Sequence, residues 1–279
     1  MRPYKNTIGR NVKEIIGGCS IEKSPIAFAV CYSDSTIQRI DSSVFKILNA
    51  WYDTKCDEKT EDRYITSACP IFDEEDEIIC ISEDLKLKRI MVSELNKRAV
   101  GSGSVIIKCI PRSPKDPDRL DYMIAATSIN KSGEKIPSYS IAPIEEIPLV
   151  SRSASGVKCA YSKDEIAPNT EVYISLIDMN QDENTKIMVG SFDSTDNQNY
   201  IYGIPANELS ITGRINKPKS LSLPKNHVVS SISMVTVENK EQVLCMVGIN
   251  SSSTLNVSNF KKPFVLKKVF LTTKASIVL

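Results

Sequence analysis

Short apolar runs separated by polar clusters dominate the pattern along this chain. The runs span four to seven residues, are rich in Val, Ile, Tyr and Phe, and are bounded by clusters of Ser, Asn, Asp, Gly and Pro. Such runs predict β-strands joined by turns, and helical periodicity is nearly absent. The best β segments are 26–32, 36–40, 78–82, 86–92, 104–110, 121–129, 172–178, 186–191, 199–204, 228–237, 242–249 and 264–271. Many short strands of this kind indicate a sandwich, a barrel or a propeller-like array.

A sequence repeat with a spacing of 50 residues selects among these architectures. Residues 28–45 align with residues 78–95 without a gap. The identities in this alignment pair Asp34, Arg39, Ile40 and Ser43 with Asp84, Arg89, Ile90 and Ser93. An acidic or apolar corner recurs at positions 45, 95, 147, 209 and 260. Repeats of this length, each holding a few short strands, are typical of blades arranged around an axis.

We therefore predict an all-β fold, a propeller-like array of about five four-stranded blades. One domain over residues 1–279 is the simpler interpretation, because the possible linkers 57–63 and 110–121 both fall within a repeat. The predicted repeat units are 25–75, 76–120, 121–183, 184–240, and 241–279 closed with 1–24.

Composition and cysteine spacing predict a reducing, cytosol-like compartment. No stretch has the length of a membrane span, and the N-terminus lacks the apolar segment of a signal peptide. The eight cysteines form no CxxC motif, and four of them, Cys31, Cys80, Cys109 and Cys245, lie inside apolar runs. We expect reduced thiols that pack as small hydrophobes. The protein is then expected in a cytoplasm.

Charge is segregated along the chain although the net charge is only +1. Residues 53–95 carry 13 acidic and 6 basic residues, whereas residues 213–279 carry 10 basic residues and only two acidic ones. A basic segment of this kind is typical of a polyanion binder. The alternative is a solvated lysine surface that keeps the protein soluble.

A loop with a basic centre follows most of the corners. The best examples are 94–109, 146–160 and 208–221, and segment 7–15 looks like the same loop without its preceding strands. Their shared elements are a corner, a Gly-Arg or Ser-Arg turn, and Gly-Val-Lys entering a strand. These elements resemble the blades of the C-terminal β-pinwheel domain of the gyrase A and topoisomerase IV A subunits. The best single match is EIPLVSRSASGVK, at 146–158, and the repeat pattern covers most of the chain.

The resemblance implies a non-catalytic β-pinwheel that binds nucleic acid, DNA or RNA, through basic residues on its outer loops. Guanidinium suits a phosphate contact because it keeps its charge under partial burial and offers a rigid fork of donors. Position by position, the implied contacts are Arg10, Arg98, Arg152 and Arg214, followed by Lys108, Lys158, Lys217 and Lys219, with a poorer match at Arg63 and an extension at Lys261, Lys262, Lys267 and Lys268. Binding through several such loops is expected to be salt-dependent and largely independent of sequence.

Two departures from the family pattern bear on function. The glutamine-arginine-glycine-lysine box with which gyrase wraps duplex DNA has no recognisable counterpart, so tight chiral wrapping is not expected. The chain opens on methionine and contains no winged-helix or tyrosine-bearing cleavage domain, so we expect a topoisomerase tail or a free-standing pinwheel. As a free-standing protein it is similar to pinwheel-like RNA-binding proteins of large-genome phages that build a nucleus-like compartment.

Enzymatic, cofactor and metal chemistry find little support in the sequence. His227 is the sole histidine and has no evident partner for a catalytic triad. Segments 73–77 and 178–184 are acidic but lack the ordered alternation and glycine of a calcium loop, so solvated turns are the better interpretation. No nucleotide-binding glycine motif is present, and we expect no cofactor and no metal.

Several alternatives remain open from the sequence. One alternative is a protein-interaction propeller, and another is an accessory tail of a type II topoisomerase. In a further alternative, the loop arginines pair with Glu94, Glu146 and Glu208 and pin neighbouring blades together. Tyrosines are further candidates for stacking on unpaired bases, although filling a sheet face is their commoner role: Tyr4, Tyr139, Tyr161, Tyr200 and Tyr202.

Overall fold

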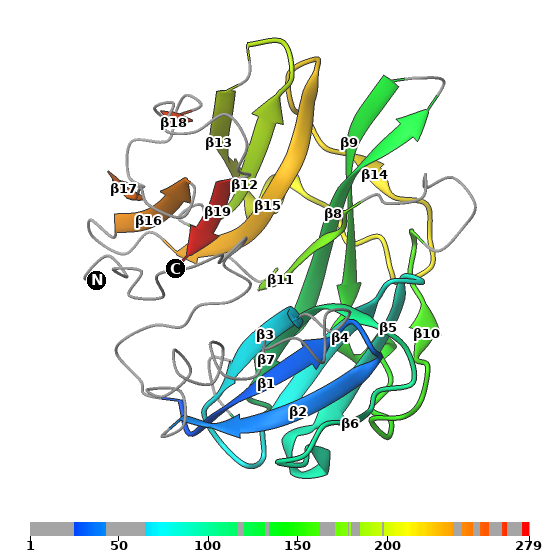
Figure 1. The fold of residues 1–279 in the computed structure, drawn as a ribbon. Helices are drawn as coiled ribbons and strands as arrows, with labels where there is room; N and C mark the ends of the chain where they lie inside the picture. The colour runs from blue at the N-terminus through cyan, green and yellow to red at the C-terminus, as the bar shows by residue number, and fades with distance from the viewer. Residues whose placement is uncertain are drawn as a thin grey trace. The chain divides into compact units, whose positions relative to one another are not determined.

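A computed structural model describes the chain in several stretches. These are residues 25–42, 65–115, 120–131, 134–161, 171–177, 179, 185–196, 198–236, 242–247, 252–256, 264–266 and 275–278. They contain strands β1–β19 and three short 3-10 helices, η1–η3 (Figure 1). Within these stretches, no helix has the length and apolar character needed to cross a membrane.

The chain folds as two compact units. One comprises residues 1–119 with 147–159, and the other residues 120–146 with 160–279. The prediction that residues 1–279 form a single domain stays a prediction.

The first unit contains two four-stranded antiparallel sheets. Their strand orders are β3-β1-β2-β6 and β10-β5-β4-β7. The strands are β1 (Ala27–Tyr32), β2 (Thr36–Asp41), β3 (Ile65–Ile71), β4 (Glu77–Ser82), β5 (Lys86–Met91), β6 (Val100–Gly101), β7 (Ile106–Arg112) and β10 (Val157–Lys158). All six residues of β4 are buried, as expected of a central strand with both faces covered.

The second unit contains three sheets, in the orders β11-β8-β9-β14, β15-β12-β13-β18 and β17-β16-β19. The strands are β8 (Tyr122–Lys131), β9 (Glu134–Pro143), β11 (Tyr173–Ile177), β12 (Thr185–Asp193), β13 (Gln198–Pro205), β14 (Lys219–Ser220), β15 (His227–Thr236), β16 (Gln242–Val247), β17 (Ser252–Asn256), β18 (Phe264–Leu266) and β19 (Ala275–Val278). The predicted all-β array of small sheets is confirmed.

The predicted corners at 95, 147 and 209 coincide with tight turns of backbone. A 3-10 helix ends just before each of them: η1 (Val92–Glu94), η2 (Ile144–Glu146) and η3 (Ala206–Glu208). The turn closes where the Leu95 N–H donates to the Val92 carbonyl at 2.9 Å, and Leu209 repeats this bond to Ala206 at 3.1 Å. Corners 45 and 260 lie outside the described residues.

In three of the sheets, an edge strand is supplied by the segment that follows the next hairpin along the chain. Strand β6 follows the β4–β5 hairpin but pairs with β2. In the same way β10 follows β8–β9 but pairs with β5, and β14 follows β12–β13 but pairs with β9. We call β6, β10 and β14 the exchanged strands. Each of them satisfies backbone groups on an otherwise open sheet edge, so consecutive repeats are linked by main-chain hydrogen bonds.

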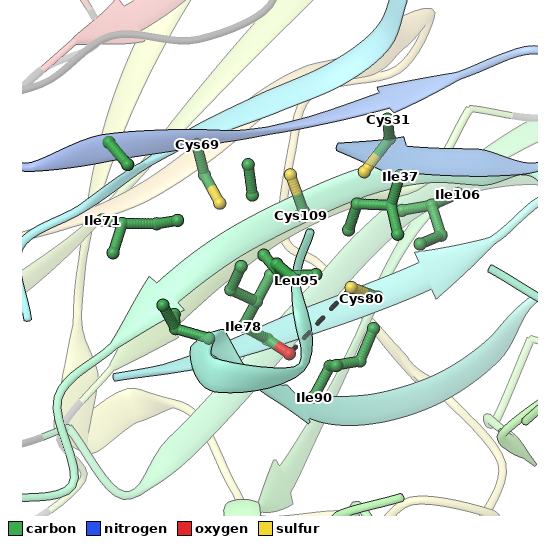
Figure 2. Packing of buried hydrophobic residues seen from close by; sticks show 13 residues of the cluster. Cys31, Ile37, Cys69, Ile71, Ile78, Cys80, Ile90, Leu95, Ile106 and Cys109 are labelled. Atoms are coloured by element: carbon green, nitrogen blue, oxygen red, sulfur yellow. Dashed lines mark hydrogen bonds between the residues drawn. The ribbon is translucent and has the colours of Figure 1, made fainter. Parts of the chain in front are cut away.

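An apolar cluster of isoleucines and cysteines packs between the two sheets of the first unit (Figure 2). Cys31, Cys80 and Cys109 are buried and have free thiols, as predicted. Cys80 lies opposite Cys109 across β4 and β7. Burial raises the pKa of the Cys80 thiol, so it remains protonated at neutral pH.

Shortening Ile90 tests this core. The side chain of Ile90 is fully buried in the cluster, so Ile90→Val is expected to reduce the free energy of unfolding by about 1 kcal/mol. Urea denaturation measures the change. Ile26, which is 38% exposed in the same unit, provides the matched control, and Ile26→Val should change stability by less than about 0.5 kcal/mol. Equal effects at both positions would contradict the packing.

Candidate nucleic-acid interface

Three of the predicted arginines occupy the same place in successive repeats. Arg98 lies between η1 and β6, Arg152 between η2 and β10, and Arg214 between η3 and β14. Each therefore stands in the segment that leads from a 3-10 corner into an exchanged strand. Arg98 is exposed, whereas Arg152 and Arg214 are half-buried.

Corner glutamates hold the backbone at two of these arginines. The Arg152 N–H donates to Glu94 Oε2 at 2.9 Å, and the Arg214 N–H donates to Glu146 Oε2 at 2.7 Å. In both cases the glutamate follows one hairpin and the arginine follows the next. The glutamate of one repeat therefore meets the arginine of the next through the main chain, with a carboxylate accepting a peptide N–H.

The guanidinium of Arg152 has no acidic partner among the described residues. Among the residues that the structure describes, no ion pair or hydrogen bond involves this group, and its Nε atom is buried without a hydrogen-bond partner. Arginine keeps its charge at any physiological pH, so a half-buried guanidinium without a carboxylate is suited to an external anion. Its rigid fork of donors matches phosphate oxygens.

The lysines predicted at the interface lie in different surroundings. Lys158 is exposed in β10, Lys219 is exposed in β14, and Lys217 is exposed just before β14. Lys108 is instead half-buried within β7, opposite Ile81. Six predicted residues lie outside the described part of the chain: Arg10, Arg63, Lys261, Lys262, Lys267 and Lys268.

Glycine permits close contact between the first two basic loops. Gly103 has a φ of +79°, which side chains rarely adopt. A Cβ atom at this position would lie 2.3 Å from the backbone oxygen of Ser153. The loop after η1 and the loop after η2 therefore touch at a point where only glycine fits.

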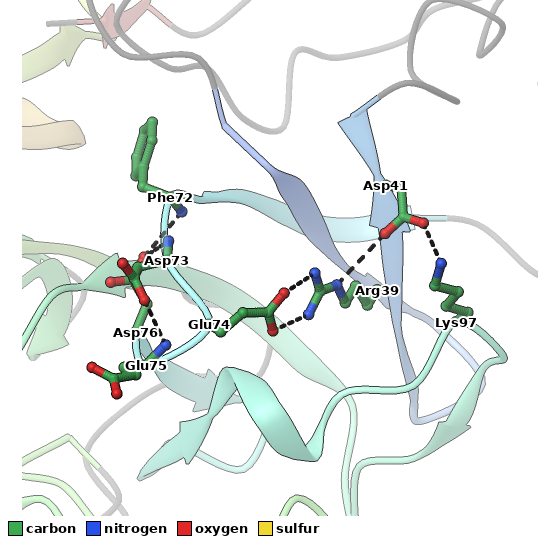
Figure 3. A network of polar contacts seen from close by, with 8 residues as sticks. All are labelled: Arg39, Asp41, Phe72, Asp73, Glu74, Glu75, Asp76 and Lys97. Atoms are coloured by element: carbon green, nitrogen blue, oxygen red, sulfur yellow. Dashed lines mark hydrogen bonds and ion pairs between the residues drawn. The ribbon is translucent and has the colours of Figure 1, made fainter.

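Other basic residues are neutralised by neighbouring acids (Figure 3). Both Nη atoms of Arg39 donate to the carboxylate of Glu74 at 2.5 Å, and Lys97 Nζ lies 2.6 Å from Asp41. These hydrogen bonds lower the pKa of Glu74 and of Asp41. Lys97 is therefore engaged within the unit, whereas its neighbour Arg98 has no ion pair in the described chain.

The acidic segment 73–77 serves the fold. Asp76 Oδ2 accepts the N–H groups of Phe72 at 3.0 Å and Asp73 at 2.9 Å, which closes the turn before β4. Glu77 is buried and accepts from Arg89 and Arg112, both at 3.0 Å. Buried charges need such partners to offset the loss of hydration. The carboxylates of Asp76 and Glu77 are therefore used in contacts within the fold.

His227 has partners that the sequence did not reveal. Its Nδ1 atom lies 2.9 Å from Ser191 Oγ, and its Nε2 atom lies 3.4 Å from Asp193 Oδ2. Ser191 and His227 are 0% and 4% exposed, so a substrate has no access to this serine. The structure thus supplies two partners for His227, and these contacts tie β12 to β15.

The tyrosines divide between core and surface. Tyr139 and Tyr161 are buried, and the Tyr161 hydroxyl donates to the Ala125 carbonyl at 3.2 Å. Tyr200 and Tyr202 are half-buried beside His227, and the Tyr200 hydroxyl donates to Asp196. The nearby carboxylates disfavour a phosphate at this position. Tyr4 lies outside the described residues.

Comparison with known proteins reveals similarity in structure alone. No protein-family model matches the sequence, and no curated protein matches it. The C-terminal domain of DNA topoisomerase IV matches with a TM-score of 0.54 at 11% identity, over 84% of this chain and 70% of that chain. The DNA gyrase A C-terminal domain matches with a TM-score of 0.56 at 16% identity, over 84% and 75%. The E. coli ParC C-terminal domain matches with a TM-score of 0.53 at 8% identity, over 91% and 99%. The chain has the β-pinwheel-like fold of these domains.

Proposed function

We propose that this chain is a non-catalytic nucleic-acid-binding protein that holds the phosphate backbone of RNA or DNA in its basic loops. The arrangement of the loop arginines carries the proposal. Arg98, Arg152 and Arg214 recur at one place per repeat, and the Arg152 guanidinium has no acidic partner in the described chain. Likeness in fold to domains of DNA gyrase and DNA topoisomerase IV supports it.

Because the contacts come from separate loops and reach phosphates, binding should be largely independent of the base sequence of the nucleic acid. Each loop presents an arginine, and the loops of Arg152 and Arg214 add exposed lysines, which suit phosphates rather than base edges. The proposed contact residues are Arg98, Arg152, Lys158, Arg214, Lys217 and Lys219. We place them on the outer loops of the pinwheel, as the sequence resemblance implies.

Salt dependence tests the proposal. Binding of single-stranded RNA, single-stranded DNA and duplex DNA of equal length is measured by fluorescence anisotropy over a salt series. Four phosphate contacts are expected to lower the affinity about 100-fold between about 50 and 200 mM salt, because bound counterions are released on association. Scrambling the base sequence should leave the affinity within about threefold.

If none of the three polymers binds at low salt, the proposal is rejected and a protein-interaction propeller is favoured. Binding with a flat salt dependence would also contradict it, since phosphate contacts require counterion release. The ranking of the three polymers distinguishes RNA from DNA as the preferred ligand.

A further inference from the structure

Lys88 is a buried cation without a carboxylate beside it. Its side chain lies on β5, opposite Cys80 of β4, and the residue is only 2% exposed. In the described part of the chain, no acid lies within ion-pair distance of its ammonium group. Lysine is rarely buried unless it is paired, so this position calls for an explanation.

All three donors of the Lys88 ammonium point to backbone carbonyls. Nζ lies 2.5 Å from the oxygen of Ser102, 2.7 Å from that of Arg152 and 2.7 Å from that of Ala154. Ser102 belongs to the loop that carries Arg98, whereas Arg152 and Ala154 belong to the next basic loop. A single ammonium therefore joins two basic loops, and its hydrogen-bonding capacity is fully used.

The peptide groups on both sides of Arg152 are consequently fixed. Glu94 accepts its N–H, and Lys88 donates to its carbonyl. The side chain of Arg152 is left as the part of this residue that can meet a ligand. Fixing the backbone in advance lowers the entropy cost of binding a phosphate there.

In two other hairpins, the residue at the position equivalent to Lys88 also donates a hydrogen bond to a basic loop. Gln38, which precedes Lys88 by one repeat, donates from Nε2 to the Lys97 carbonyl at 2.7 Å. Ser140 stands four residues before η2, as Lys88 stands four before η1, and its hydroxyl donates to the Gly213 carbonyl at 3.3 Å. Lys88 is the charged member of this series and the one that reaches two loops.

We propose that Lys88 is a positioning residue that holds the loops of Arg98 and Arg152 in the arrangement that binds phosphate. This inference rests on the proposed function. Lys88 is buried, so it affects binding through the loops that it holds and does not itself contact the nucleic acid.

A double-mutant cycle on the full chain tests the role of Lys88, with a short single-stranded RNA and a duplex DNA as probes. Lys88→Met and Arg152→Ala are each expected to weaken binding roughly tenfold, and the double variant is expected to be hardly weaker than either single one. Such coupling arises if Lys88 acts through the Arg152 loop. Independent, additive losses would overturn the proposal, as would a Lys88→Met variant that binds like the wild type.

Lys88→Gln is the conservative variant, because an amide retains two of the three donors, as Gln38 does in the preceding repeat. It should bind more tightly than Lys88→Met, and it decides the cycle if the methionine variant does not fold. A folded Lys88→Gln variant whose loss adds to that of Arg152→Ala would overturn the proposal. Failure of the wild type to bind either probe would instead reject the proposed function, so the two failures are distinguishable.

Discussion

Replacing both Arg152 and Arg214 by glutamate is expected to weaken nucleic-acid binding by roughly 100-fold or more. A hydrogen bond to a charged group contributes about 1.5–3 kcal/mol, and glutamate adds repulsion of the phosphate to the loss of two such bonds. The backbone contacts of both residues to Glu94 and Glu146 use the peptide N–H, so they do not require an arginine side chain. The fold should therefore persist, which circular dichroism and urea denaturation would check.

A matched control separates local contacts from net charge. Lys115 and Lys135 are exposed and lie outside the basic loops, so Lys115→Glu with Lys135→Glu changes the net charge by the same amount. The surface ion pair of Lys115 with Glu75 contributes little to stability, so its loss is tolerable. This control should bind within about threefold of the wild type at moderate salt, because distant exposed charges are screened. Equal losses in both double variants would show that the assigned loops are not the binding surface.

Strands with regular apolar patterns were predictable, and those without were not. Segments 26–32 and 36–40 agree closely with β1 and β2. Strand β9, ten residues long, was missed because Pro137 and two serines resemble a turn. It is a strand because it pairs with β8 along its whole length, and tertiary pairing of this kind overrides local preference.

The exchanged strands left no signal in the sequence. Strands β6, β10 and β14 are two residues long, which is too short for any alternation of apolar and polar side chains. The repeat alignment predicted where the basic loops start but not which hairpin each loop joins. That connection depends on hydrogen bonds to the preceding repeat, which spacing within a loop does not encode.

The roles of individual charged residues were predictable only in part. Recurrence identified Arg98, Arg152 and Arg214 as equivalent, and it pointed to Glu94 and Glu146 as their possible partners. Which atom of an arginine meets the glutamate depends on the path of the loop. Lys88 stands between Leu87 and Arg89 in β5 and resembles a solvated strand position, so its burial against loop carbonyls was not foreseen. Its partners Arg152 and Ala154, 64 and 66 residues away, were similarly hidden.

Replacing Gly103 by alanine is expected to reduce the free energy of unfolding by roughly 3 kcal/mol. A non-glycine residue at a φ of +79° costs about 1–3 kcal/mol, and a further cost of about 1–3 kcal/mol comes from overpacking, because the new Cβ would lie 2.3 Å from Ser153 O. That oxygen belongs to the loop backbone, which must move to relieve the overlap and so displaces the Arg152 loop. Weaker nucleic-acid binding should accompany the loss of stability.

Gly101, two residues away, provides the control for this prediction. A Cβ atom at Gly101 meets nothing within 4 Å, and its φ is not in the left-handed region. Gly101→Ala is therefore expected to be neutral or to stabilise the protein by about 0.4–1 kcal/mol, since alanine restricts the unfolded chain. Urea denaturation of both variants measures the difference. A Gly103→Ala variant as stable as Gly101→Ala would show that the two basic loops do not meet at Ser153, and the continuous phosphate-binding surface inferred for Arg98 and Arg152 would lose its structural basis.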